Sequence, residues 1–164
     1  MKPEYKLVAK AKYIQLTAQL ADELWREVYA RRLTPRQLDA VLERQQSTEA
    51  IEEQIDADYN YFIVFLAGKP VGYYAWQMQG SILYLAHLYL APGVRGRGIG
   101  RDILQSCERL ARADGRTAVA AVVGQKELDT QGFFKGGGYK ALRAVQQPLA
   151  DGILWDALWM EKRL

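Results

Sequence analysis

A glycine-rich basic turn between an apolar run and a helical pattern constrains this chain more than any other stretch. The apolar residues 82–90 lead into a turn with glycine at positions 96, 98 and 100. Glycine adopts positive φ readily and leaves room for a ligand to approach the backbone. The apolar spacing from Ile103 to Ala111 then predicts a helix, whose first N–H groups have no partner within the helix. Such a turn is suited to hold a phosphate group.

Three arginines add positive charge to this turn, at Arg95, Arg97 and Arg101. A polyanion would meet both these side chains and the positive end of the helix dipole. An Arg-Gly segment of the kind that binds nucleic acid usually lies in low-complexity sequence. Because this one lies between an apolar strand and an amphipathic helix, we expect an anionic small molecule and no nucleic-acid partner.

Two common nucleotide-binding motifs do not fit this spacing. A P-loop needs Lys-Ser or Lys-Thr after its last glycine, whereas Gly100 is followed by Arg101 and Asp102. A dinucleotide-binding fingerprint needs G-x-G-x-x-G, whereas here every second residue from 96 to 100 is glycine. The phosphate-bearing ligand should therefore belong to another class.

Residues 95–100, Arg-Gly-Arg-Gly-Ile-Gly, resemble the acyl-coenzyme A signature Arg/Gln-x-x-Gly-x-Gly/Ala of the GNAT superfamily of N-acyltransferases. The resemblance extends over residues 72–139 and the closing residues 159–164. It implies an α/β fold with a mixed, twisted sheet, in which the parallel strands around a crossover helix splay apart. It also implies acetyl-coenzyme A as cosubstrate. The region 33–51 is similar to the polyamine acetyltransferase branch.

The resemblance implies a cofactor site as well. In the family, the strand end bonds to the pantetheine arm and the loop amides hold the pyrophosphate. The matching residues of this chain are Leu88, Tyr89, Leu90, Arg95, Gly96, Arg97, Gly98, Ile99, Gly100, Arg101 and Phe134.

The amine acceptor creates a need for a base, since an amine of pKa about 10.4 is almost fully protonated at pH 7. Relatives carry a glutamate on one of two strands, but this chain has Val122 on one and His87 on the other. His87 is the only histidine, and its ordinary pKa near 6.5 suits proton transfer. The alternative is a histidine packed on a sheet face, and the sequence leaves both roles open.

A second departure concerns the acid that protonates the leaving thiolate. Where relatives carry a tyrosine, this chain has Phe134, and Glu127 replaces the asparagine that usually precedes this helix. A thiol of pKa about 8.5 is an adequate leaving group without help, at a cost of about 2 kcal/mol. The missing acid should therefore slow the reaction and not prevent it.

Composition sets the remaining expectations. The chain has 164 residues, of which 49% are hydrophobic, so we expect one domain over residues 1–164. Its net charge of +3 suits an anionic ligand. A single cysteine, Cys107, excludes an intramolecular disulfide and a cysteine-rich metal site, and its place on an apolar helix face predicts burial. No segment reads as a signal peptide or membrane span, so we expect a cytoplasmic protein without membrane or metal partners.

Pattern along the chain predicts one strand, three helices, three antiparallel strands, the crossover helix and then strand, helix, strand, strand. The three early helices should begin at Thr17, Pro35 and Ser47 or Thr48; Thr34 and Gln37 form a capping box for the second. The strand after the crossover helix, 117–123, should run parallel to 82–90. The final strands should cover 140–145 and 153–161, with a loop at 146–152.

The function that follows is transfer of an acetyl group from acetyl-coenzyme A to a primary amine of a small molecule or peptide. The alternative is a non-catalytic protein that binds acyl-coenzyme A as a sensor. The sequence leaves the oligomeric state open and is compatible with a homodimer.

Overall fold

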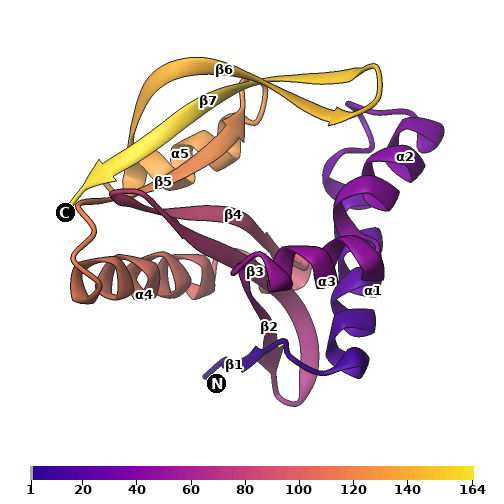
Figure 1. Cartoon of the computed structure of the whole chain (residues 1–164), viewed down its shortest axis with the longest axis horizontal. Coiled ribbons are helices and arrows are strands. Elements are labelled where there is room, and N and C mark those ends of the chain that lie inside the picture. Colours follow the sequence, from indigo (N-terminus) through magenta and orange to yellow (C-terminus); the bar gives the residue numbers. More distant parts are fainter. Residues whose placement is uncertain (1) are drawn as a thin grey trace. The chain divides into compact units, whose positions relative to one another are not determined.

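The computed structural model describes residues 2–164 and has a mixed α/β architecture (Figure 1). Its elements follow the predicted order. They are β1 (Glu4–Leu7), α1 (Ala11–Val28), α2 (Pro35–Gln46), α3 (Thr48–Asp56), β2 (Asn60–Leu66), β3 (Lys69–Gln79), β4 (Ile82–Leu90), a short 3-10 helix (Pro92–Val94), α4 (Ile99–Ala113), β5 (Ala118–Gly124), α5 (Leu128–Gly136), β6 (Lys140–Ala150) and β7 (Ile153–Arg163).

The strands form a seven-stranded sheet in the order β1-β2-β3-β4-β5-β7-β6. β4 pairs with β5 in parallel, as the crossover helix between them requires, and β5–β7 and β6–β7 are antiparallel. The parallel pairing joins Ile82–Leu85 to Ala118–Ala121 and ends partway along both strands. This mixed sheet with its flanking helices confirms the predicted fold class.

The residues group into two compact units: residues 2–75 with 87–97, and residues 76–86 with 98–164. β3 and β4 each contribute residues to both units. The expectation of one domain over residues 1–164 stays a prediction.

Three mutually packed helices, α1 to α3, characterise the first unit. Thr34 and Gln37 form the predicted capping box of α2, and Ser47 caps α3. The predicted start of α1 at Thr17 was wrong, because the helix begins at Ala11. Thr17 is fully buried and its hydroxyl donates to the carbonyl of Tyr13, so packing holds the first turns in helical form despite their diffuse pattern.

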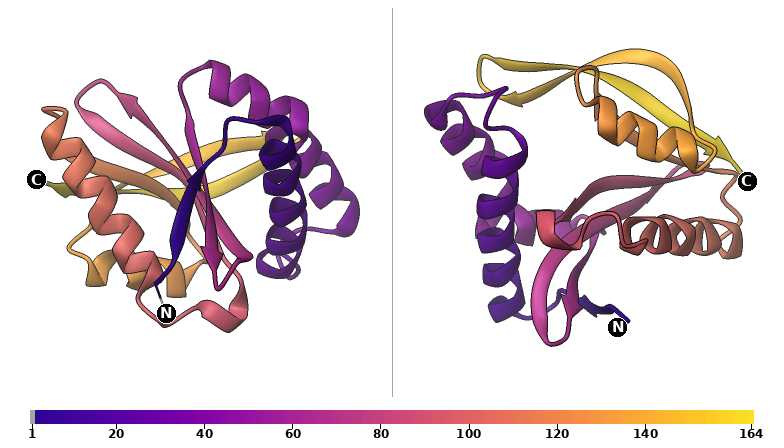
Figure 2. Two further views of the ribbon diagram at one scale, coloured as in Figure 1. Left: turned by 90° about the horizontal axis from the view of Figure 1, so that it is seen from below. Right: turned by 180° about the vertical axis from the view of Figure 1, so that it is seen from behind.

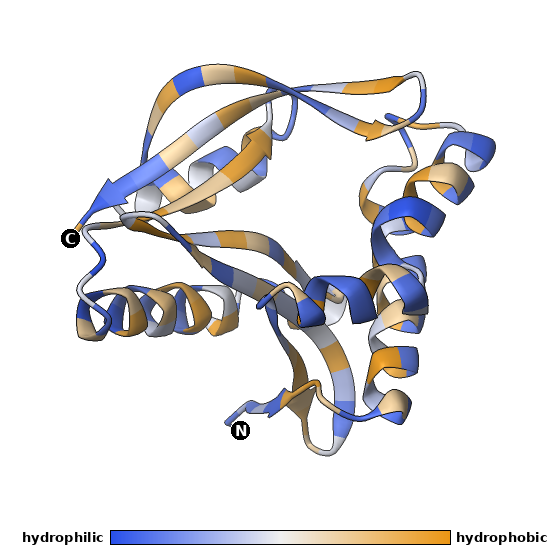
Figure 3. Cartoon of the chain, in the orientation of Figure 1, coloured by the Kyte–Doolittle hydropathy of each residue, from blue (hydrophilic) through white to orange (hydrophobic). Residues whose placement is uncertain are grey.

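In the second unit α4 packs against β5, and its ribbon carries both hydrophobic and hydrophilic residues (Figure 3). Ile103, Leu104, Cys107 and Ala111 are buried, which confirms the burial of the cysteine and most of the predicted stripe, whereas Leu110 is 40% exposed. The helix ends at Ala113, with Asp114 as its C-cap, and the φ of +74° at Gly115 fits a glycine that follows a helix.

The last two strands are longer than predicted and form a long hairpin with α5 beside it (Figures 1 and 2). Residues 146–148 pair with Asp156, Trp155 and Leu154, so most of the predicted loop at 146–152 is strand. Pro148 is tolerated because β6 lies at the sheet edge, where one side of the strand needs no ladder hydrogen bonds. No helix within residues 2–164 combines the length and apolar character that crossing a bilayer requires.

Candidate functional site

The glycine-rich turn has the backbone that its sequence predicts. Gly96 and Gly98 have φ of +76° and +85°, and Gly98 is the N-cap of α4 without a side-chain cap. Gly98 gives the first N–H groups of α4 no side-chain cap, and a Cβ atom added at either glycine would meet nothing within 4 Å. The positive end of a helix with space around its glycines fits a pyrophosphate group.

The three arginines of the turn have different surroundings. Arg95 forms an ion pair with Glu27, and its Nε donates to the carbonyl of Leu90 at 2.9 Å. Arg101 lies over the ring of Phe133, 5.2 Å from its centre, and its Nη2 is 3.4 Å from the carbonyl oxygen of that residue. Arg97 is exposed and has no ion-pair partner within residues 2–164. Arg97 is thus the arginine of the turn that is most available to an anion.

The end of β4 is held closely by β3. Ala91 donates its N–H to the carbonyl of Val71 at 2.8 Å, and Gly72 lies against the backbone of Tyr89 and Leu90. Leu88, Tyr89 and Leu90 each keep some exposed surface. The strand end is therefore both fixed in position and partly accessible, as a binding surface for an extended ligand should be.

His87 lies among aromatic rings from three other elements and from β4 itself. The ring centres of Trp25, Tyr61, Tyr73 and Tyr89 are 5.7, 6.1, 6.3 and 6.2 Å from that of His87. Although the residue keeps some accessible surface, burial lowers the pKa of the imidazole from 6.5 to about 4. The ring is therefore neutral throughout the physiological pH range.

Gln46, the last residue of α2, connects His87 to a buried hydrogen-bond network. Its Oε1 accepts from the hydroxyl of Tyr73 at 2.6 Å, and its Nε2 donates to the hydroxyl of Tyr61 at 3.0 Å. The same Nε2 lies 3.4 Å from Nε2 of His87. Gln46 was not among the predicted site residues, although a polar residue four positions after Leu42, on the apolar stripe of α2, is a usable signal.

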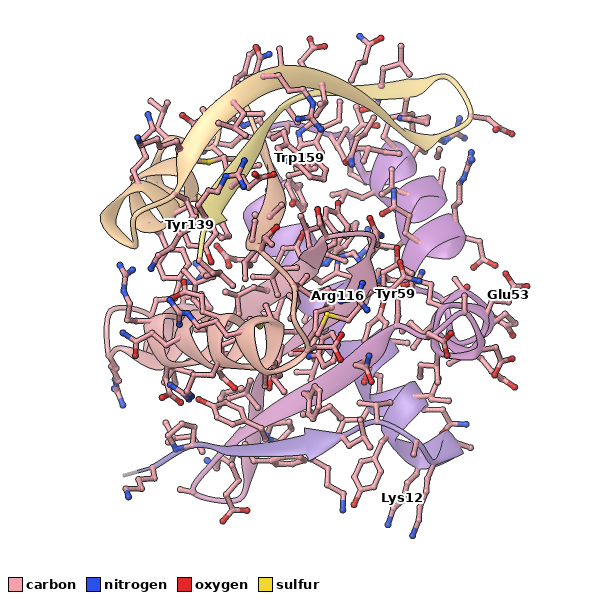
Figure 4. All side chains as sticks on the ribbon, turned by 60° about the vertical axis from the view of Figure 1, so that its left-hand side comes forward. Lys12, Glu53, Tyr59, Arg116, Tyr139 and Trp159 are labelled. Carbon is pink, nitrogen blue, oxygen red and sulfur yellow. The ribbon has the colours of Figure 1, made fainter. Side chains whose placement is uncertain are left out.

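Phe134 lies on α5 and is buried against Tyr139, with 5.3 Å between ring centres. The tyrosine nearest in sequence is Tyr139, which precedes β6 (Figure 4). This hydroxyl donates to Glu108 at 2.9 Å, and burial together with this carboxylate raises the pKa of Tyr139 well above its ordinary value. Tyr139 therefore does not replace the acid that is absent at Phe134.

The described residues form neither a metal site nor a reactive thiol. Within residues 2–164, no group of three or more His, Cys, Asp or Glu side chains is placed to hold a metal ion. Burial, with a smaller contribution from Glu108, raises the pKa of the Cys107 thiol to about 12. A thiol of that pKa is protonated at neutral pH, so Cys107 is unsuited to act as a nucleophile.

Solved structures share this fold over their whole length. A PaiA N-acetyltransferase from Thermoplasma acidophilum, in complex with coenzyme A, is 18% identical with a TM-score of 0.83, and all of both chains is covered. A GCN5-related N-acetyltransferase from Rhodopseudomonas palustris is 20% identical with a TM-score of 0.82, covering 100% of this chain and 97% of the other. A ribosomal-protein-alanine N-acetyltransferase from Brucella melitensis is 18% identical with a TM-score of 0.70 and full coverage of both chains.

Sequence comparison adds the family. A search of curated proteins finds no match. The family model of the acetyltransferase (GNAT) domain matches residues 29–164, which is most of the chain. The protein therefore belongs to the GNAT acetyltransferase family and is an acyltransferase enzyme.

Proposed function

We propose that this protein transfers the acetyl group of acetyl-coenzyme A to a primary amine of a small molecule or peptide. The observation that carries the proposal is the turn before α4, where Gly96 and Gly98 have positive φ and a Cβ atom added at either would meet nothing within 4 Å. In the reaction, a C–N bond forms, the C–S bond breaks, sulfur leaves with the bonding electrons and the amine proton goes to solvent.

Most of the residues proposed to form the cofactor site belong to two groups that contact the cofactor. The turn and the first residues of α4 bind the phosphates, through backbone amides and through Arg97 and Arg101. The end of β4 binds the pantetheine arm. The full set is Leu88, Tyr89, Leu90, Arg95, Gly96, Arg97, Gly98, Ile99, Gly100, Arg101 and Phe134. Of these, Arg95 acts by holding the turn, and Phe134 acts by packing α5.

The acceptor class rests on the family and on the chemistry of the site. The lowered pKa of His87, about 4, makes the ring a weak base, and Phe134 has no hydroxyl to act as an acid. Both favour a reaction that depends on positioning two reactants more than on a side-chain base and acid. The similar structures include a ribosomal-protein-alanine N-acetyltransferase, which supports testing peptide amino termini as well as small amines.

Binding is tested with Gly98→Asp, and Gly115→Asp is the control. Both glycines have positive φ, and a Cβ at either meets nothing within 4 Å, but they lie at opposite ends of α4. We expect wild type and Gly115→Asp to bind coenzyme A with a Kd on the order of micromolar by calorimetry, and Gly98→Asp to lose binding. Equal affinity of the two folded variants would remove the basis of the proposal.

Turnover is tested by following release of free thiol from acetyl-coenzyme A with a panel of polyamines, amino acids and peptides. We expect release that depends on one class of amine, with mass spectrometry showing the acetylated product. Binding of coenzyme A without amine-dependent release across the panel would contradict acetyl transfer to these acceptors.

Two further expectations remain part of this proposal. We propose that the protein acts in the cytoplasm, where a chain with one buried thiol needs no oxidising environment. We also propose that residues 1–164 act as one domain. Coincident urea transitions by tryptophan fluorescence and circular dichroism would support one cooperative unit, and separate transitions would contradict it.

A further inference from the structure

We infer that Gln46 holds the imidazole of His87 in the tautomer with its proton on Nδ1, so that His87 acts as a hydrogen-bond donor, not as a base. The assignment of the tautomer stands on the hydrogen bonds of the first unit alone. The role of the donor in acyl transfer rests on the function proposed above.

The orientation of the Gln46 amide is fixed by its neighbours. Its Nε2 lies 2.5 Å from the carbonyl oxygen of Gln45, which can only accept, so this position must be the NH₂ group. Its Oε1 accepts a hydrogen bond from the Tyr73 hydroxyl, which itself accepts from the indole N–H of Trp25 at 2.8 Å. Turning the amide over would place two oxygens against each other and leave the Tyr73 proton facing an NH₂ group.

The proton of Tyr61 is also accounted for. Its hydroxyl donates to Oε1 of Gln54, so toward Gln46 it can only accept. The NH₂ group of Gln46 therefore directs hydrogens at the carbonyl of Gln45 and the hydroxyl of Tyr61. No lone pair remains on this group for a third neighbour, because an amide nitrogen does not accept hydrogen bonds.

His87 meets this group with its Nε2 at 3.4 Å. A proton on Nε2 would face the hydrogens of the NH₂ group, whereas a lone pair on Nε2 is attracted to them. The neutral ring therefore carries its proton on Nδ1. Protonation of Nε2 would create the same conflict in the charged form, which agrees in direction with the burial that lowers the pKa of His87 to about 4.

The other ring nitrogen is available to a ligand. Within residues 2–164, Nδ1 has no hydrogen-bond partner. It is not fully buried, so a ligand can reach it. The side chains around the ring are Trp25, Gln46, Tyr61, Tyr73 and Tyr89, none of which is charged at neutral pH. Burial raises the pKa of both Tyr61 and Tyr73, so these hydroxyls stay protonated.

A neutral imidazole with an accessible N–H suits an oxygen that gains negative charge. During acyl transfer, the carbonyl oxygen of the acetyl group gains such charge, and a preorganised donor stabilises it. A ring of such low pKa is a weak proton acceptor, but its N–H remains a good donor. His87 would therefore stabilise this oxygen, and the amine would lose its proton to solvent.

The tautomer can be read directly because the chain has one histidine. In ¹⁵N-labelled protein without ligand, long-range ¹H–¹⁵N correlation at pH 7 should show one imidazole, with Nδ1 as the protonated nitrogen and Nε2 as the unprotonated one. The pattern should hold until the pH falls below 5. A ring protonated on Nε2, or an even mixture of tautomers, would overturn the inference whatever the enzyme does.

Gln46→Glu tests the cause. A carboxylate oxygen in place of the NH₂ group can accept a hydrogen bond from a protonated Nε2. We therefore expect the proton to move to Nε2 and the pKa of His87 to rise by at least about one unit. Gln54→Glu is the control. It makes the same chemical change, but the Tyr61 hydroxyl separates residue 54 from Gln46, so this variant should leave the His87 spectrum unchanged. Identical His87 spectra in both variants would show that Gln46 does not set the tautomer.

Three substitutions of His87 test the donor role by kcat. The side-chain nitrogen of asparagine is bonded to Cγ, as Nδ1 is, whereas that of glutamine matches Nε2. His87→Asn should therefore keep most of kcat, while His87→Gln and His87→Ala should lose about 10²-fold. Loss in all three would favour a base, and loss in none would show packing alone; both results would overturn the donor role. Absence of turnover in wild type would instead contradict the proposed function and leave the tautomer standing.

Discussion

Arg95 forms an ion pair with Glu27, with 2.5 Å between Nη2 and Oε1, although 68 positions separate the two residues. The same side chain bonds to the carbonyl of Leu90, so it connects α1 to the end of β4. The two side chains are 41% and 44% exposed, and a pair of this kind contributes less than about 1 kcal/mol. The ion pair fixes the start of the turn. It also partly neutralises the positive charge with which Arg95 could otherwise bind an anionic ligand.

The first prediction separates the two neighbouring arginines. Arg95→Ala should lower the free energy of unfolding by about 1 kcal/mol, because it removes the ion pair and the bond to Leu90. Arg97→Ala should leave stability unchanged but weaken coenzyme A binding roughly 3- to 10-fold. The affinity of this variant should also depend less on salt concentration than that of wild type. Urea unfolding and calorimetry measure the two effects. Stronger loss of binding in Arg95→Ala than in Arg97→Ala, at equal stability, would contradict this division.

Local chemistry explains why much of the fold could be predicted. Three predicted features depend only on residues close in sequence: the capping box at Thr34 and Gln37, the glycines of the turn and the apolar stripe of α4. They can therefore be predicted without knowledge of the fold. The parallel pairing of β4 and β5 followed from the crossover helix between them. Family and cosubstrate class followed from residues 95–100.

What could not be predicted depends on partners distant in sequence. The first turns of α1 and the paired residues 146–148 are decided by packing and by the edge position of β6, which no local pattern shows. His87 was found as a candidate because it is a lone histidine, but its tautomer depends on Gln46, 41 positions away. A network that joins α1, α2, α3 and three strands becomes visible only in the structure.

The second prediction is a dependence of stability on pH that belongs to His87. Its pKa is about 4 in the folded protein and 6.5 when unfolded, so between these values the unfolded chain binds more protons. The contribution is complete above pH 6.5, falls as pH decreases and is lost below pH 4; in full it is worth roughly 3 kcal/mol. His87→Gln lacks this titration. Urea unfolding of both proteins at pH 7.5, 5.5 and 4.5 measures this effect. The difference between their free energies of unfolding should change between pH 6.5 and pH 4 and stay constant above pH 6.5.

The third prediction concerns the buried carboxylate of α4. Glu108 is 6% exposed and accepts from Tyr139 at 2.9 Å and from Lys162 at 3.1 Å. Tyr139→Phe removes one hydrogen bond and should cost about 1 kcal/mol. Glu108→Ala removes both hydrogen bonds and leaves the partly buried ammonium of Lys162 unpaired. It should therefore lower the free energy of unfolding by about 3 kcal/mol. Equal losses in the two variants, measured by urea unfolding, would show that the ion pair adds nothing to the hydrogen bond.

The last prediction concerns the contact that fixes the end of β4. A Cβ atom on Gly72 would clash with the carbonyl oxygen of Tyr89 and lie 2.7 Å from Cδ2 of Leu90, closer than real contacts allow. Gly72→Ala must therefore push β3 away from the strand end, and overpacking of this kind costs about 1 to 3 kcal/mol. Gly93→Ala is the control, because its added Cβ meets nothing within 4 Å and its φ is not positive.

Since Leu88, Tyr89 and Leu90 are proposed to bind the pantetheine arm, displacement of this strand end should also weaken binding. We expect Gly72→Ala, measured at a temperature where it is fully folded, to bind coenzyme A at least about 10-fold more weakly than Gly93→Ala. Adenosine 3′,5′-bisphosphate, which lacks the pantetheine arm, should bind both variants equally, because its contacts lie at the turn and α4. Loss of both ligands in Gly72→Ala would show that the substitution damages the phosphate turn, and unchanged binding of both would show that the strand end does not hold the arm.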